Sequence, residues 1–394
     1  MADRVVPWNN LPTELLEAIG KHLKTKTDIS RFRAICRSWR SSVPPFDQKP
    51  RFPIRIMMKF HSPVNCFFLT ITESIVYHLV PSPNINSDAS ASTSSTRGWV
   101  VRLREGESGE TSMLHPLSSS FHIKRLPKSV FPKLLNLLEF QVFKLAKTYT
   151  MYHSDQRVSS HRVAISLSPD WPAIMVVAAG KLYHCKLGPD IEMCTMVKDI
   201  TSEFFEDVIC FEGKFYAVCH NSTAVVVDPS LEMTLLASPK SPDHDSGVHC
   251  IKNLVESLGE ILLVERYPNR MKQHRFVPIK FRVYKLNAVE RKWVEMEGLD
   301  GRILCVGDNN CCFSVPAGDF PGCQRSCIYF SDPCFTNCYS NDSLGRKFKI
   351  CAFNLEDGSL LPLRYNPGSC NIFLPPSTWP TPKRKKQKQT TLSL

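Results

Sequence analysis

The sequence contains no long hydrophobic run. None of its 394 residues lies in a stretch that approaches the roughly 20 consecutive apolar residues of a membrane-spanning helix. The opening residues, Met1 to Pro12, also lack the apolar segment of a secretory signal. We therefore expect a soluble intracellular protein that has no membrane partner.

Recognisable catalytic motifs are absent as well. The sequence has no Gly-rich phosphate loop, Walker pattern, protein-kinase signature or paired-metal constellation. A cysteine nucleophile would need a base within hydrogen-bond reach, and the candidates His184, His220 and His249 belong to no known signature. The sequence therefore predicts a protein that is not an enzyme and needs no cofactor.

Most of the chain carries little net positive charge. The formal net charge is +12, from 49 basic and 37 acidic residues. Residues 1–55 carry 11 basic and 5 acidic side chains, and residues 383–388 add five basic ones, so the long middle part is close to neutral. A nucleic-acid-binding domain usually gathers positive charge on one face, because affinity rises with the number of phosphates neutralised. We expect no such domain, and keep weak nucleic-acid binding through the basic ends as an alternative.

Cysteine is abundant, with 16 residues, seven of which lie between Cys305 and Cys338. Without a secretory signal we expect reduced thiols, several of them as small buried residues in strands. Cys323, Cys327, Cys334 and Cys338 could be considered as a zinc site. However, Cys327 lies in a predicted strand, where alternate residues face opposite sides, so we predict packed thiols and no metal.

The chain changes character near Pro44 and Pro45. Before them, Leu15, Ile19 and Leu23 recur at four-residue spacing, which predicts an amphipathic helix. Two further short helices are expected before residue 44. About 40 residues bury too little apolar surface to fold well alone, so some of these side chains should face outward and be covered by a protein partner.

After Pro53 the sequence reads as short strands separated by turn residues. The first of these apolar runs are Ile54–Met58, Cys66–Ile71, Ile75–Val80 and Trp99–Leu103, and many more follow up to Leu363. The sequence GKLY at 180–183 is echoed as GKFY at 213–216, like hairpin corners that reappear. The pattern favours a mainly β fold of the β-propeller type. A strand over residues 54–58 could pair with a C-terminal strand and close the ring.

The helical region resembles an F-box. The resemblance rests on LPTELL at 11–16, on Asp28 and Arg31, and on RAICRSWR at 33–40, and it covers residues 5–44. It implies binding to the Skp adaptor of a cullin-based ubiquitin ligase. The residues that would then contact the adaptor are Leu11, Pro12, Leu15, Leu16, Ile19, Leu23, Ile29, Phe32, Cys36 and Trp39.

Most of the remaining chain resembles a plant group in which an F-box precedes a KIB-type β-propeller. The matching stretches are KWVEM at 292–296, LCVG at 304–307, CFSV at 312–315, FPGC at 320–323, CIYF at 327–330, FNLEDGS at 353–359 and residues 375–380. The resemblance implies a propeller over residues 50–380, for which we expect six or seven blades. A disordered Ser-rich loop is predicted near 81–98 and a basic disordered tail at 381–394.

Together these features predict a substrate-recognition subunit of an SCF-type ubiquitin ligase, whose propeller recruits an unknown protein target. Two alternatives stay open: a ligase-independent propeller module that regulates a kinase or nuclear factor, and a nucleic-acid-associated protein. The tail residues Lys383, Arg384, Lys385, Lys386 and Lys388 form a candidate nuclear-import signal. We therefore expect the nucleus as the main location, with the cytoplasm as a second one.

Overall fold

The chain forms two compact units, Met1–Arg51 and Phe52–Leu394, each described here by itself. The computed structural model describes residues 11–23, 26–43, 52–59, 66–81, 98–106, 111–118, 140–153, 156–157, 161–168, 170–187, 193–238, 250–267, 270–272, 275–277, 279–307, 311–320, 323–332, 349–363 and 372–373. The predicted Ser-rich loop, apart from its end residues Pro81 and Gly98, and the basic tail lie outside the described residues.

The described part of the first unit contains the helices α1 (Thr13–His22), α2 (Lys26–Ile35) and α3 (Arg37–Ser42). Pro12 directly precedes α1, a position where its missing N–H is no loss, and its carbonyl accepts the N–H groups of Leu15 and Leu16 at 3.1 and 3.2 Å. No described helix is long and apolar enough to cross a bilayer.

Five sheets of at least four strands make up the described part of the second unit. The first contains β1 (Ile54–Lys59), β2 (Cys66–Pro81), β3 (Trp99–Glu105), β4 (Thr111–Leu114), β5 (Phe140–His153) and β6 (Gln156–Arg157). The second contains β7 (Arg162–Leu167), β8 (Pro172–Ala178), β9 (Lys181–Lys186) and β10 (Thr195–Met196). The third contains β11 (Phe205–Phe211), β12 (Lys214–Cys219), β13 (Ala224–Val227) and β14 (Met233–Ala237).

The fourth sheet contains β15 (Ile251–Ser257), β16 (Glu260–Tyr267), β19 (Lys280–Asn287) and β20 (Lys292–Met296). A separate hairpin, β17 (Arg270–Lys272) and β18 (Arg275–Val277), is inserted in it. The fifth sheet contains β21 (Arg302–Val306), β22 (Cys312–Pro316), β23 (Cys327–Asp332), β24 (Lys349–Asn354) and β25 (Leu360–Leu363), with the 3-10 turn η5 (Ala317–Asp319) after β22.

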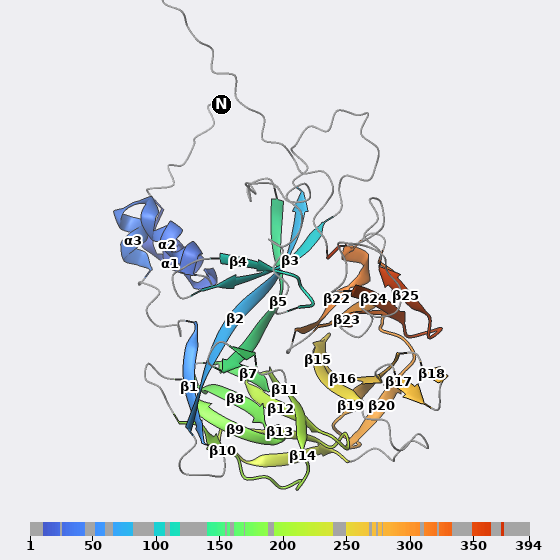
Figure 1. Ribbon diagram of the computed structural model, residues 1–394. Helices are drawn as coiled ribbons and strands as arrows, with labels where there is room; N and C mark the ends of the chain where they lie inside the picture. Colours follow the sequence, from blue (N-terminus) through green and yellow to red (C-terminus); the bar gives the residue numbers. More distant parts are fainter. Residues whose placement is uncertain are drawn as a thin grey trace, which may run out of the picture. The chain divides into compact units, whose positions relative to one another are not determined.

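The five sheets form a closed ring. Their strands β5, β7, β11, β15 and β22 contact one another in that order, and β22 contacts β5 again, so these strands surround a common centre (Figure 1). Neighbouring strands step outward from them in each sheet. This is the arrangement of a β-propeller, and the predicted mainly β class is confirmed.

The predicted blade number of six or seven is wrong, because the described residues form five blades. Two of the predicted strands, 66–71 and 75–80, are parts of one 16-residue strand, β2. The first and fifth sheets also contain six and five strands instead of four. The number of strands therefore cannot be converted into a number of blades at four strands per blade.

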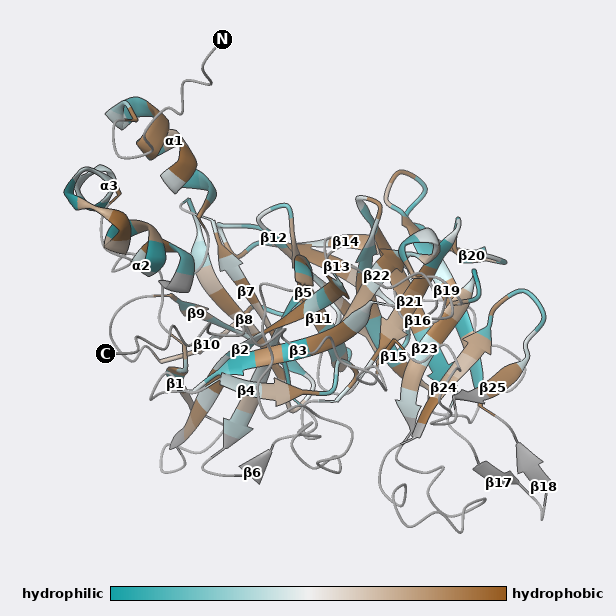
Figure 2. Cartoon of the chain, turned by 90° about the horizontal axis from the view of Figure 1, so that it is seen from above, coloured by the Kyte–Doolittle hydropathy of each residue, from teal (hydrophilic) through white to brown (hydrophobic). Residues whose placement is uncertain are grey.

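Each contact between neighbouring blades has its own hydrophobic cluster, so strands such as β8 and β16 are buried over continuous runs of residues; Figure 2 shows the chain coloured by hydropathy. Ile174 and Met175 are consecutive in β8, yet they pack toward opposite neighbours, so both faces of the sheet are buried. One representative pair from each contact, in ring order from the first blade, is Leu69 and Ile174, Met175 and Phe215, Val218 and Leu263, Leu262 and Phe330, and Tyr329 and Val100.

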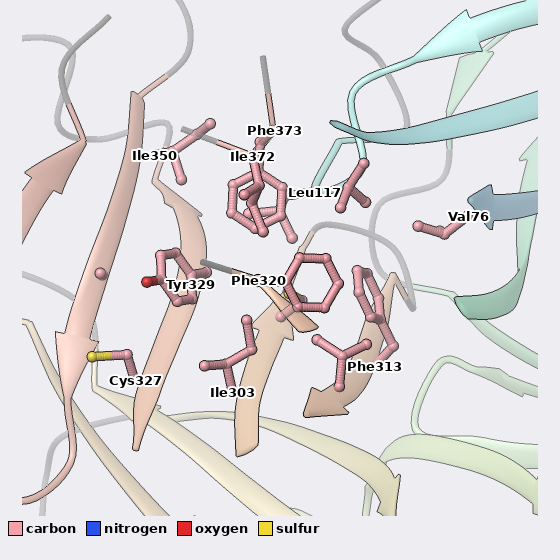
Figure 3. Packing of buried hydrophobic residues seen from close by; sticks show 14 of the residues in the cluster. Val76, Leu117, Ile303, Phe313, Phe320, Cys327, Tyr329, Ile350, Ile372 and Phe373 are labelled. Carbon is pink, nitrogen blue, oxygen red and sulfur yellow. The ribbon is translucent and has the colours of Figure 1, made fainter. Parts of the chain in front are cut away.

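The first and last blades are joined by side-chain packing. The expectation that residues 54–58 pair with a C-terminal strand is wrong, because β1 pairs with β2 over Ile54–Lys59. Instead, Leu117 and Phe373 are inserted beside Phe320 and Tyr329 in one buried cluster (Figure 3). A shared strand would close the ring with backbone hydrogen bonds, whereas here apolar burial supplies most of the contact.

A few hydrogen bonds reinforce this junction. The Val100 N–H donates to the Ile372 carbonyl at 2.8 Å, so the chain returns to β3 after the fifth blade. The Ser331 hydroxyl donates to the Leu117 carbonyl at 3.2 Å. These two hydrogen bonds fix the positions of Leu117 and Ile372 relative to the first and fifth blades.

The centre of the propeller is polar at Asp207 on β11. Its Oδ2 atom accepts the Leu254 N–H of β15 at 2.7 Å, and its Oδ1 atom lies 3.8 Å from Nε of Arg162 on β7. Burial raises the pKa of the Asp207 carboxyl to about 6, although Arg162 opposes the shift. One side chain thus connects three consecutive blades.

The repeated GKLY and GKFY sequences are hairpin corners, as predicted. In each, the glycine is the second residue of a two-residue turn with positive φ, which is +72° at Gly180 and +74° at Gly213. The turn at Gly180 joins β8 and β9, the second and third strands of the second blade. The turn at Gly213 joins β11 and β12, the first and second strands of the third blade. The two corners are therefore not equivalent positions, and their separation does not measure the blade repeat.

The expectation of reduced cysteines is wrong for one pair. Cys185 and Cys194 form a disulfide, because the pairing of Thr195 with His184 places them opposite each other at the edge of the second blade. Cys327 is free and fully buried in β23, in agreement with its predicted strand position. Cys334 and Cys338 lie outside the described residues.

We predict that Leu117→Ala lowers the free energy of unfolding by about 2 to 5 kcal/mol, because it leaves a cavity in the cluster between the first and last blades. Urea unfolding followed by tryptophan fluorescence measures the change. Val289→Ala, at a side chain that is 94% exposed, is the matched control and should change little. Equal stability of the two variants would contradict the assigned role of Leu117.

Candidate functional site

The helical unit has a small core of its own. Leu16, Ile29, Phe32, Trp39 and Val43 are buried together, with contributions from all three helices. The rings of Phe32 and Trp39 lie with centroids 4.4 Å apart. This contact anchors α3 against α2, so the unit has a defined surface.

Gly20 allows α1 to approach the end of α3 closely. A Cβ atom at this position would lie 2.3 Å from Cγ2 of Val43, which is far inside van der Waals contact. The residue is buried in the last turns of α1, on the same face as Leu16. Glycine is therefore needed here for space and not for backbone conformation.

Two arginines of the RAICRSWR motif hold α2 and α3 together. The Arg33 guanidinium donates to the carbonyl of Arg40 at 2.7 Å and to that of Val43. In return, the Arg40 Nε–H donates to the Arg33 carbonyl at 3.1 Å. These side chains satisfy carbonyls near the helix ends, so part of the motif has a structural role.

One stripe of α1 is apolar and exposed. Leu15 and Ile19 are 52% and 37% exposed, and their four-residue spacing places them one above the other on the helix. Leu16 and Gly20, each one residue further, face the core instead. The helix α1 therefore has one apolar side that faces the core of the unit and another apolar side that is exposed.

The ten predicted adaptor-binding residues fall into three groups. Leu16, Ile29, Phe32 and Trp39 lie in the core of the unit. Leu11, Leu23 and Cys36 are half-buried and pack against that core. Only Pro12, Leu15 and Ile19 are exposed.

Ile35 was missed by the sequence reasoning. It lies at the end of α2 and is 55% exposed. The sequence pattern contained a signal for its exposure. Ile29, Phe32 and Cys36 share the core-facing stripe of the predicted helix, and Ile35 lies outside that stripe. Leu15 and Ile19 are called the apolar surface of the helical unit below.

This surface suits protein binding and offers no catalytic chemistry. Apolar side chains held on a rigid helix are typical of the buried centre of a protein interface. Within the described ranges, no group of three or more His, Cys, Asp or Glu side chains is arranged to hold a metal ion.

The two candidate bases that the structure describes, His184 and His220, are engaged by other side chains. His184 is buried and stacked on Trp171, with ring centroids 6.1 Å apart. His220 bonds the Glu206 carboxylate at 2.7 Å, and burial raises the pKa of the neighbouring Cys219 thiol to about 12. His249 and the five tail residues Lys383 to Lys386 and Lys388 lie outside the described residues.

Comparison with known proteins gives a consistent match. A family model described as KIB1-4 beta-propeller matches residues 68–354. The chain is 26% identical to F-box protein SKIP23 of Arabidopsis thaliana, over 96% of both chains. It is 25% identical to F-box protein At2g17036 of the same plant, over 98% of both. Among solved structures, a Synechocystis apocarotenoid oxygenase matches 75% of this chain and 78% of its own at 9% identity, but its TM-score of 0.30 carries no argument.

We predict that Gly20→Leu destabilises the helical unit by about 1 to 3 kcal/mol, because the new side chain must displace Val43. Hydrogen exchange measured by mass spectrometry over residues 13–43 of the full chain reports the loss of protection. Ala18→Leu adds the same side chain at an exposed position of α1 and is the control. Unchanged protection in Gly20→Leu would show that α1 and α3 do not pack as described.

Proposed function

The chain belongs to the plant F-box proteins that carry a KIB1-4 β-propeller, and we propose that it is the substrate-recognition subunit of a cullin-based SCF-type ubiquitin ligase. In this proposal the helical unit binds a Skp-type adaptor and through it the cullin. The propeller binds the protein that is to be ubiquitinated.

The observation that carries this proposal is the apolar surface of the helical unit. Leu15 and Ile19 stay exposed although Leu16, one residue away, already fills the core. Full burial of an aliphatic side chain is worth about 1.5 to 3 kcal/mol, so a partner that covers both residues gains substantially. The buried residues of the F-box pattern support this surface by fixing how the helices pack.

The proposed role of the chain is non-catalytic. The ligase chemistry belongs to other subunits, and the propeller contributes by holding a target protein near them, which replaces a bimolecular encounter by a local one. A closed ring is a suitable scaffold, because its loops can vary while the sheets remain paired.

We predict that Leu15→Asp combined with Ile19→Asp reduces capture of a purified Skp-type adaptor by at least about 100-fold, because both changes place charge in an apolar contact. Both side chains are exposed, so the variant should fold. Isothermal titration calorimetry with the full chain measures the affinity.

The control for this experiment is Glu17→Lys combined with Lys21→Glu, which alters the other exposed side of α1. Its affinity should match that of the wild type. Undiminished binding by the Leu15 and Ile19 variant would refute the assigned interface. Failure of the wild type to bind the adaptor would favour the ligase-independent module.

The proposed location is the nucleus, directed by the basic segment at 383–388. In a fluorescent-protein fusion expressed in plant cells, changing Lys383, Arg384, Lys385, Lys386 and Lys388 to alanine should shift the fusion from the nucleus to the cytoplasm. Import receptors recognise such lysine-rich segments, so loss of the charges removes the signal. Nuclear accumulation that persists in this variant would exclude the segment as the signal.

A further inference from the structure

One buried arginine of the first blade has no charged partner. Arg102 lies in the middle of β3 and is completely buried, with a relative exposure of 0%. Its Nη2 atom donates to the Thr150 hydroxyl at 2.8 Å, but its Nε and Nη1 atoms are buried and have no hydrogen-bond partner in the described part of the chain. Arginine stays charged in proteins, and a buried charge without a counter-ion is strongly unfavourable. A bound anion would remove this penalty.

A buried hydroxyl lies beneath the same guanidinium. In the strand register Arg102 lies opposite Val76 of β2, and Thr150 of β5 lies opposite Thr72. Ser74 stands between Val76 and Thr72 on the same face of β2, so the Arg102 side chain crosses β2 over Ser74 to reach Thr150. Ser74 is 1% exposed, and its hydroxyl has no hydrogen-bond partner among the described residues. Two neighbouring buried groups thus have unused hydrogen-bond donors.

This face of the first blade carries a second positive charge. Arg104 lies two residues after Arg102 in β3 and therefore shares its face. Its guanidinium donates to the Tyr152 hydroxyl and lies 5.7 Å from the centre of the Tyr152 ring. Within the described ranges neither arginine forms an ion pair. The two guanidinium groups repel each other, and an anion beside them would reduce that repulsion.

The acidic residues of these strands face elsewhere. The strands of the first sheet contain two of them, Glu73 and Glu105, and strand alternation places both on the face opposite to Arg102. Glu73 pairs there with Lys147 at 2.6 Å, and Glu105 is exposed. On the neighbouring fifth blade, Asp319 is exposed and makes no ion pair with Arg102 as far as the described residues go. These carboxylates therefore do not neutralise Arg102.

We propose that Arg102 and Ser74 bind a small oxyanion, a phosphate or carboxylate group, and that Arg104 strengthens the site by its charge. Guanidinium and hydroxyl groups supply hydrogen-bond donors, and the planar guanidinium matches the oxygen atoms of both groups. Thr150 orients the guanidinium through its Nη2 atom. The proposed site is independent of the proposed ligase function.

The approach to this site runs along β3. Burial decreases from Arg102, which is buried, to Arg104, which is half-buried, and Glu105, which is exposed. Tyr152, beside Arg104, is also half-buried. An anion from solvent therefore meets the Arg104 guanidinium first. Because Arg102 and Ser74 are covered, the anion must be small, and we expect it to exchange slowly.

The site adjoins the junction that closes the ring. Val76 lies opposite Arg102, and Val100 lies two residues before it on the same face. Both valines belong to the buried cluster that contains Leu117 and Phe373. A ligand that binds only the folded protein raises its apparent stability. We therefore expect the bound anion to stabilise the closed ring.

Equilibrium dialysis of the full-length protein against radiolabelled inorganic phosphate, at constant ionic strength, measures the binding. We expect saturable binding, and a rise in the thermal unfolding temperature of about 2 °C or more at saturation. Acetate is the second probe. Displacement of phosphate by acetate at similar concentration would assign the site to carboxylates, and resistance to acetate would assign it to phosphate groups.

Variants of the protein locate this binding. Arg102→Met removes the buried charge and should weaken phosphate binding at least about tenfold, because a charge-assisted contact is lost. In phosphate-free buffer it should be at least as stable as the wild type, because an unpaired buried charge is unfavourable. Ser74→Ala should weaken binding about threefold or more. Arg325→Met removes the same charge at an exposed position and should leave the affinity unchanged.

Three results would overturn the proposal. Neither phosphate nor acetate binds saturably, which would leave water as the partner of Arg102. Chloride displaces phosphate as well as acetate does, which would remove the preference for oxyanions. Arg102→Met and Ser74→Ala both keep the wild-type affinity, which would place the bound phosphate elsewhere.

Discussion

The structure of the second unit depends on the packing that joins its first and last blades. β1 pairs within the first blade, and among the described strands none is shared between the first and last sheets. Leu117, Phe320 and Phe373 supply the contact instead, and all three are almost completely buried. Without this cluster the ring would open, and the faces of two sheets would be exposed to water. The strands β5 and β22 could then no longer complete the circuit around Asp207.

Some apolar side chains of the described residues stay exposed although these cores are complete. Examples are Leu15 and Ile19 in the helical unit and Ile200 and Phe204 in the propeller. In both cases the exposed residues are held by fixed neighbours, with Leu16 and Gly20 below the first and Gly180 below the second. Rigid presentation lowers the entropy lost on binding, so both surfaces are suited to protein partners.

Much of the fold could be predicted from local sequence patterns, and the errors have physical causes. The change from helical to strand periodicity locates the start of the propeller, and the GKLY and GKFY repeats indicate hairpin corners, because positive φ favours glycine. Blade number could not be predicted in this way, since β2 continues through residues 72–74, which separate two apolar runs in the sequence. The Cys185–Cys194 disulfide also depends on the register between β9 and β10, which the cysteine count does not contain. For the helical unit, the pattern identified apolar residues without separating Leu15 from Leu16.

The sequence by itself determined the mainly β class, the helical start and the family, because these follow from periodicity and from motifs of adjacent residues. Tertiary structure alone decided which apolar residues are buried, how the ring closes, and that Phe204 rests on Gly180 while its ring stays exposed. The physical reason is that burial depends on contacts between segments far apart in the chain. Phe204 and Phe205 are neighbours of the same type, and only the position of the surrounding blades places one at the surface and the other in the core.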